Sequence, residues 1–169
     1  MEQKLYFKPG TWWIYRDSVT GITDSCVVQN AFKDVFTQIG DPTTYERLHI
    51  DIFAYRNNGK IDTFSSYMDM VGNSITYGCS APVAAVLGSV YATVTYPFAG
   101  APLTLNGTTY NNVVTTFSNT LFYVHDHPTV SISKPSYIND EVGIIKCYVP
   151  HTADSVFDVR ELVRYNIVR

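Results

Sequence analysis

The stretch Tyr45–Arg56, YERLHIDIFAYR, decides the fold class of this chain of 169 residues. Every second residue from Leu48 to Ile52 is a branched aliphatic residue. This period of two places alternate side chains on opposite faces of an extended strand. Asn57–Gly59 is a strong turn signal, and Ile61–Met70 supplies a second strand. The sequence therefore predicts a β-hairpin at this point of the chain.

More strands are predicted on both sides of this hairpin. Upstream, Trp12–Arg16 and Thr23–Asn30 form another hairpin around Gly21. Downstream, the pattern predicts strands at Val90–Tyr96, Tyr110–Phe117 with a continuation over Asn119–Val124, Val142–Val149, and a last strand with Val159, Val163, Tyr165 and Ile167. About eight strands with short turns predict an all-β fold, a single antiparallel meander sheet that is strongly curved or forms a partial barrel. At most one or two short helices are expected.

Composition limits the classes of function. Charged residues make up 16% of the chain, below the roughly 25% that is typical of soluble domains. The net charge is −3 and the basic residues are scattered, which excludes a nucleic-acid partner because phosphate binding needs clustered Lys and Arg. No signal peptide or transmembrane segment is predicted. One domain over residues 1–169 is expected.

The stretch Met70–His125 contains no Asp, Glu, Lys or Arg in 56 residues, whereas the other 113 residues carry 27 of them. One interpretation is a pair of central strands that are buried on both faces. The other is the wall of an apolar cavity or a partner surface. Tyr91, Tyr96 and Phe98 are then candidate ligand contacts, together with Trp13 from the first hairpin.

Motifs for catalysis and metal binding are absent. His125 and His127 have the spacing of two imidazoles on one face of a strand, but a polar turn before a proline explains them equally well. Cys79 would need a distant histidine to act as a nucleophile, and a buried thiol is the commoner role. We therefore expect no catalytic residue, no cofactor and no metal site.

Four aspartates offer carboxylates for an acid pair, but nothing in their spacing singles out two of them. They are expected to be surface carboxylates: Asp24, Asp51, Asp62 and Asp69.

Two further residue types leave alternatives open. Trp12 and Trp13 are adjacent, so one indole enters the core and the other needs a covering element or an edge position. Cys26, Cys79 and Cys147 allow one disulfide with one thiol, or three thiols.

Several motifs in chain order resemble small secreted or lipid-anchored envelope proteins of the Bacteroidetes. Gly10–Ser25 has the form of their G-x-x-W-x-Y-x-D-S…G…D-S hairpin. Asn106–Val113 resembles their G-x-x-Y-x-N-V strand. Val142–Lys146 resembles their V-G-I-V-K strand, which a terminal strand like Glu161–Tyr165 follows.

The resemblance implies a periplasmic or outer-membrane lipoprotein whose leader and lipidated cysteine are missing from the chain. It also implies a curved sheet distantly similar to lipoprotein carriers, with an apolar concave face, and membrane contact only through the lipid anchor. It brings no catalytic residue with it.

The leading hypothesis is a non-enzymatic envelope domain that binds an apolar small molecule, a lipid or a protein partner. The alternatives are a small hydrolase that uses Cys79 or the His125/His127 pair, and a purely structural surface module.

Overall fold

The computed structural model describes most of the chain. The described residues are 7–37, 40, 44–71, 74–79, 91–95, 99–124, 127–150 and 157–169. For some of these residues only the backbone is described, namely 36, 45, 64–71, 74–79, 91–95, 118–124, 127–132 and 150.

The described residues form eleven β-strands and no helix. The strands are β1 (Trp12–Asp17), β2 (Thr23–Thr37), β3 (Thr44–Tyr55), β4 (Ile61–Val71), β5 (Ser74–Cys79), β6 (Tyr91–Thr95), β7 (Ala101–Leu105), β8 (Thr108–Val124), β9 (His127–Asn139), β10 (Gly143–Pro150) and β11 (Phe157–Asn166). They make one antiparallel sheet in the order β6-β5-β4-β3-β2-β1-β11-β10-β9-β8-β7. The first and last strands therefore pair in the middle of the sheet, and β6 and β7 are its edges.

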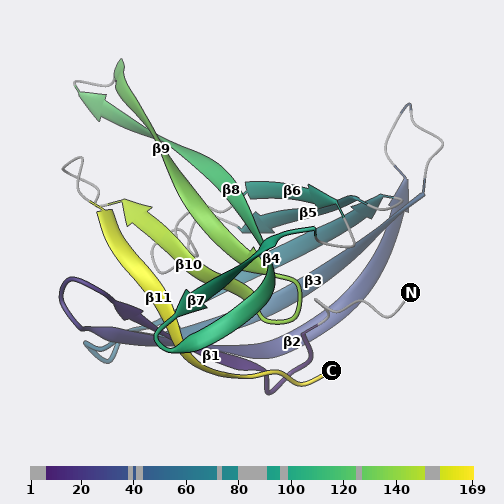
Figure 1. Ribbon diagram of the computed structural model, residues 1–169. Helices are drawn as coiled ribbons and strands as arrows, with labels where there is room; N and C mark the ends of the chain where they lie inside the picture. The colour runs from purple at the N-terminus through teal and green to yellow at the C-terminus, as the bar shows by residue number, and fades with distance from the viewer. Residues whose placement is uncertain are drawn as a thin grey trace.

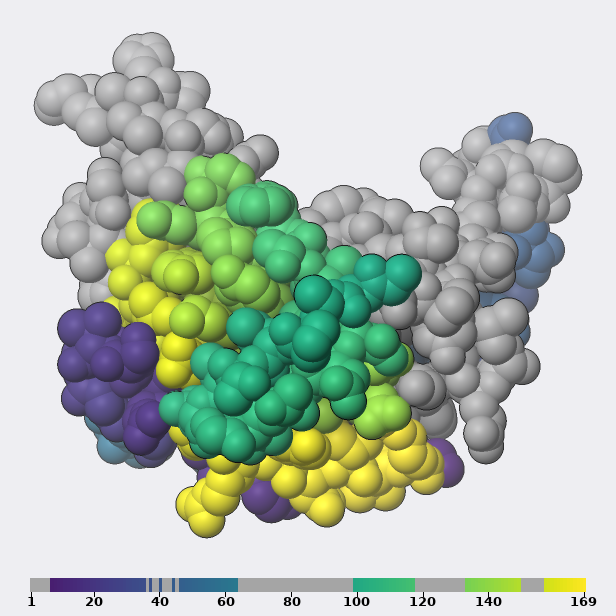
Figure 2. Space-filling model, in the orientation of Figure 1, coloured from purple at the N-terminus to yellow at the C-terminus, as the bar shows by residue number. Residues whose placement is uncertain are grey.

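The sheet rolls up without closing (Figure 1). β6 comes close to β8, but no ladder joins them among the described residues. In Figure 2, β7 and the first part of β8 (green) lie over β11 (yellow), and the Asn106 side chain donates to the carbonyl of Leu162 at 3.3 Å. The predicted all-β, strongly curved meander is confirmed.

The core lies on the inner side of the roll. It combines Leu48, Ile50 and Ile52 from β3 with residues from most other strands, among them Ile138, Ile145 and Leu162. The alternation that predicted β3 therefore also identified its buried face.

β1 contributes two large aromatic side chains to this core. The Trp13 indole lies edge-on to Phe7, with ring centroids 5.0 Å apart, and its Nε1 donates to the carbonyl of Val142 at 2.9 Å. The Tyr15 hydroxyl donates to the carbonyl of Ile144 at 2.8 Å. Ile144 lies at a bulge in the β9–β10 pairing, where a carbonyl is released from the ladder and can accept such a bond. The other indole, Trp12, which precedes Trp13 in β1, is half-buried.

Several strand boundaries differ from the sequence-based expectation. β5, β7 and β9 were not predicted, the two segments expected at Tyr110–Phe117 and Asn119–Val124 form the single strand β8, and β2 continues to Thr37. The interpretation of His127 and the following proline as part of a turn is wrong, since both begin β9. The helix or loop considered for Pro82–Gly88 lies outside the described residues.

Candidate functional site

Of the four predicted ligand contacts, only Trp13 has a described side chain. Tyr91 is the first residue of the edge strand β6, while Tyr96 and Phe98 lie outside the described residues. Trp13 is only 6% exposed, so it contributes to core packing in this structure. Among the described side chains of the uncharged stretch, Leu105, Tyr110 and Val113 are buried, but Phe117 is 65% exposed. The expectation of central strands buried on both faces is wrong for this part of the stretch, where β7 is an edge strand.

The residues of the hydrolase alternative are described only as backbone or not at all. Cys79 ends β5 and His127 begins β9, and His125 lies outside the described residues. Within the described part of the chain, no group of three or more His, Cys, Asp or Glu side chains is placed to hold a metal ion. Cys26 and Cys147 are buried in the core as thiols rather than joined in a disulfide.

The most pronounced polar feature is a buried ion pair between β2 and β11. The guanidinium of Arg160 donates to Asp24 at 2.9 Å, and the two side chains are 8% and 3% exposed. Burying two charges is costly unless the pair is well formed and hydrogen-bonded. Asp24 meets this condition because its other oxygen accepts from the backbone N–H of Asn57 at 3.2 Å. The expectation that Asp24 is a surface carboxylate is wrong.

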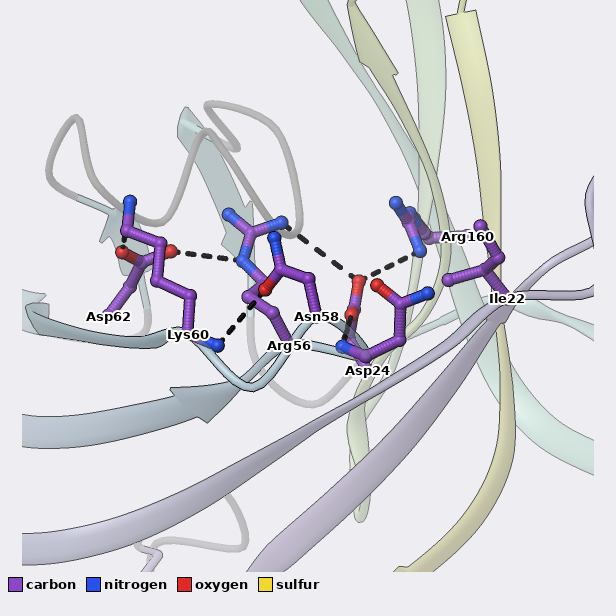
Figure 3. Close-up of a pocket in the computed structure, with 8 residues that line it drawn as sticks. Ile22, Asp24, Arg56, Asn58, Lys60, Asp62 and Arg160 are labelled. Carbon is purple, nitrogen blue, oxygen red and sulfur yellow. Dashed lines mark hydrogen bonds and ion pairs between the residues drawn. The ribbon is translucent and has the colours of Figure 1, made fainter.

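Arg56, in the turn after β3, extends this pair into a network. Its Nε donates to Asp62 at 3.0 Å, and its Nη1 lies 4.0 Å from Asp24. The Lys60 ammonium reaches the other oxygen of Asp62 at 2.8 Å. The contact with Lys60 holds the pKa of the Asp62 carboxyl below its usual value. Partial burial acts in the opposite direction, and Arg56 adds to the effect of Lys60. Figure 3 shows Asp24 between the two guanidinium groups, with Arg56 on one side and Arg160 on the other.

Two of the three guanidinium nitrogens of Arg160 contact carboxylates. Its Nη2 reaches Asp158 at 3.3 Å, but its buried Nε makes no hydrogen bond among the described residues. Buried donors are normally paired, so an unpaired one needs an explanation.

Two hollows open at this network. One, of about 280 Å³, is lined by Ile22, Asp24, Arg56, Asn57, Asn58, Lys60, Asp62 and Arg160. The other, of about 350 Å³, is lined by Ile14, Thr23, Asp24, Ser25, Tyr55, Arg56, Asn57, Val163 and Arg164. Both are lined by Asp24, Arg56 and Asn57, but they open on opposite faces of the sheet, because Ser25 pairs with Ile14 and Tyr55, whereas the neighbouring Asp24 pairs with the buried Tyr15. We call the first hollow the polar cleft.

Sequence reasoning did not find the polar cleft. Asp24 and Arg160 are 136 positions apart, and only the pairing of β1 with both β2 and β11 brings them together. The local signal was the Asn57–Gly59 turn, which predicted where β3 ends but not what lies beside it.

The chain matches no family model, and no curated protein or solved structure is significantly similar to it. The described residues include no helix long and apolar enough to span a membrane.

Proposed function

We propose that this protein is a non-enzymatic binding domain whose rolled sheet receives an apolar ligand, such as a lipid. The ligand would enter at the open part of the roll, by which we mean the inner face next to Val35 of β2. The absence of a nucleophile–base motif in the sequence supports a binding role. The composition of Met70–His125 supports an apolar ligand.

The observation that carries this proposal is the change along the inner side of β2 and β3. Val35 pairs with Glu46 and Lys33 with Leu48, and directly paired residues share one face of a sheet. Leu48 is 5% exposed in the core, whereas Val35 is 61% exposed. The inner face therefore passes from sealed to open within one pair of neighbouring positions.

The uncharged strands lie at this level of the sheet. The register runs from Leu48 across β4 to Tyr77 of β5 and then to Ala92 of β6. β6 is also the edge that approaches β8 without a ladder between them. An unpaired edge beside an open inner face gives a ligand a route into the roll.

The proposal is tested by titrating the neutral, environment-sensitive dye Nile red into the folded protein. We expect saturable binding, and about tenfold weaker binding after Val35→Asp, since a tenfold change corresponds to about 1.4 kcal/mol. Val19→Asp is the matched control, because Val19 is 77% exposed in the turn before β2. Native mass spectrometry of the purified protein is expected to show a retained lipid.

The absence of saturable dye binding would contradict the proposal. Equal effects of the Val35 and Val19 variants would place the dye elsewhere. If only a protein partner bound, and the Val35 variant abolished that binding without any dye site, the open part would be a partner surface instead.

We also propose a location in the cell envelope, supported by the resemblance of Gly10–Ser25 and Val142–Lys146 to lipid-anchored envelope proteins. Fractionation of cells that make the native protein tests this location. Recovery with the membrane fraction supports it, and recovery only in the cytosol contradicts it.

A further inference from the structure

A row of four paired residues crosses the outer face of the sheet, the face that points away from the core, at the second hollow. Arg164 of β11 pairs with Ile14 of β1. Ile14 pairs with Ser25 of β2, which pairs with Tyr55 of β3. Directly paired residues share one face of a sheet. Because Ser25 is much smaller than the other three side chains, the row dips between Tyr55 and Arg164. We call this hollow, of about 350 Å³, the outer hollow.

A β-bulge shapes the β11 side of the outer hollow. The register between β1 and β11 shifts between Ile14 and Tyr15, which leaves Val163 as the extra residue. A bulge re-aims the side chains next to it, and both Val163 and Arg164 line the hollow. Its lining therefore combines apolar surface from Ile14 and Val163 with a guanidinium group.

Five polar side chains of the outer hollow make no hydrogen bond or ion pair among the described residues. All five are at least partly exposed, namely Thr23, Ser25, Tyr55, Asn57 and Arg164. Hydroxyl and amide groups both donate and accept. A ligand that displaces water from such groups must reproduce the hydrogen bonds of that water. A ligand with several hydroxyls meets this demand.

Arg164 gives the outer hollow a positive charge without a compensating carboxylate. The other charged residues that line it are Asp24 and Arg56. Asp24 is held by Arg160 at 2.9 Å, and Arg56 by Asp62 at 3.0 Å. These groups point toward one another on the other face of the sheet, in the polar cleft (Figure 3). The outer hollow is therefore suited to an anionic group, and a carboxylate can accept two parallel hydrogen bonds from one guanidinium.

We propose that the outer hollow binds a uronic acid, a sugar residue that carries a carboxylate. The carboxylate accepts hydrogen bonds from Arg164, and one face of the sugar ring packs against Tyr55. The sugar hydroxyls bond to Thr23, Ser25 and Asn57. Arg164 and Tyr55 lie three strand spacings apart, or about 14 Å between their backbones, which leaves room for one sugar ring between the two side chains.

The outer hollow is separate from the proposed apolar site. Val35 lies on the inner face and Tyr55 on the outer face, toward opposite ends of the β2–β3 hairpin. The stretch from Glu46, the partner of Val35, to Tyr55 spans about 30 Å in an extended strand. The uronic acid is therefore a second ligand, and its binding does not depend on the apolar one.

The experiment is a titration of the full chain with matched sugars, followed by ligand-observed NMR and isothermal calorimetry. Glucuronate and galacturonate are each compared with glucose and galactose, which have a hydroxymethyl group in place of the carboxylate. Acetate and inorganic phosphate are the anions without a sugar. We expect saturable binding of at least one uronate, at least tenfold weaker binding of its neutral counterpart, and no binding of acetate or phosphate. Trigalacturonate is included to distinguish a residue within a polysaccharide from the free sugar.

Two variants test the roles of the lining residues. Arg164→Gln removes the positive charge and is expected to weaken uronate binding about tenfold, or about 1.4 kcal/mol. Tyr55→Ala removes the ring and is expected to have an effect of similar size. Lys60→Gln is the matched control for charge, because Lys60 lines the polar cleft and not the outer hollow. Tyr165→Ala is the matched control for the ring, because Tyr165 is also 39% exposed and lines neither hollow.

Four results would overturn the proposal. They are the absence of saturable uronate binding, equal affinity for a uronate and its neutral counterpart, binding of acetate or phosphate as tight as that of the uronate, and a loss of uronate binding in the two controls as large as in Arg164→Gln and Tyr55→Ala. Nile red binding is expected to be unchanged in the Arg164→Gln variant, so failure here is distinguishable from failure of the apolar site.

Discussion

Asp24 shows how a single carboxylate can depend on residues that are distant in sequence. Arg160 from β11 and the backbone of Asn57 both bind it, and its side chain is 3% exposed. Removing one member of a buried ion pair leaves the other without compensation, which typically costs 3–5 kcal/mol.

The first prediction is that Asp24→Asn lowers the free energy of unfolding by about 3 kcal/mol. The low end of the range applies because Arg160 keeps its contact with Asp158. Chemical denaturation measures this change. Lys60→Gln is the control, with an expected loss below about 1 kcal/mol, since Lys60 is 68% exposed. The double variant Asp24→Asn/Arg160→Met should recover much of the loss; no recovery would show that the pair is not the cause.

The second prediction concerns Asp17, the buried carboxylate that follows Tyr15 and Arg16 in β1. Burial raises its pKa, but hydrogen bonds from the Val19 and Thr20 amides and the charge of Arg160 outweigh it, so the pKa lies below the ordinary 3.8. A depressed pKa stabilises the fold at pH values above the unfolded value, and this contribution is lost as the pH falls through the folded value. The wild type is therefore expected to lose stability steeply below about pH 4.

Denaturation midpoints between neutral pH and pH 3 test this expectation. Asp17→Asn should be less stable than the wild type at neutral pH and should show a shallower loss on acidification. A parallel pH dependence of the two proteins would exclude Asp17 as a source of acid sensitivity.

At the scale of the element, the sequence predicted strands wherever polarity alternates. β1, β3 and β4 were found within one or two residues of their observed bounds. β1 and β3 each have one face in the core and one toward solvent, and β4 follows the Asn57–Gly59 turn signal. β5 and β7 lie in the uncharged stretch, where no charge marks the solvent face and a turn signal alone is ambiguous.

No strand was predicted where β9 lies. Pro135 is inside this strand and pairs with Phe117 of β8, although proline is rare within sheets. In the described ladder β10 pairs with β9 only at Tyr137, Ile138 and Asn139, so the side of β9 at Pro135 that faces away from β8 needs no N–H donor.

The third prediction concerns Gly100, immediately before the edge strand β7. A Cβ at this position would overlap the carbonyl of Val113 in the neighbouring strand. Gly100→Ala is therefore expected to push β7 away from β8 and to speed hydrogen exchange of the β7 amides. Gly107→Ala is the control: Gly107 has a φ of +79° with open space around it, so its cost is backbone strain of about 1 kcal/mol. A smaller effect at Gly100 than at Gly107 would mean that β7 adjusts without loss.

At the scale of the whole molecule, the polar cleft could not be predicted because it depends on which strands become neighbours. Alternation identifies a strand but not its partners, and the first and last strands meet in the centre of this sheet. Tyr91 was chosen from composition alone and stays a prediction, because only its backbone is described, at the start of the edge strand β6. Trp13 was assigned to a binding wall because an exposed and a buried indole look alike in sequence.

The fourth prediction follows from the strand order. Every hydrogen-bonded pair of neighbouring strands is also consecutive in the chain, except β1 with β11. The ends that flank this pair lie close together, since Lys8 donates its backbone N–H to the Val168 carbonyl at 3.1 Å. Joining the two ends with a Gly/Ser linker and opening the chain between β6 and β7, the two edges, makes every pairing local. Loop closure then costs less entropy before contacts form.

This circular permutant is expected to keep the far-UV circular dichroism of the parent and to refold faster in stopped-flow mixing. A second permutant, opened at Asn58–Gly59, is the matched control, because it makes the β3–β4 pair non-local while β1–β11 becomes local. It should refold more slowly than the first permutant. Equal rates for both permutants and the parent would show that pairing of the terminal strands does not limit folding.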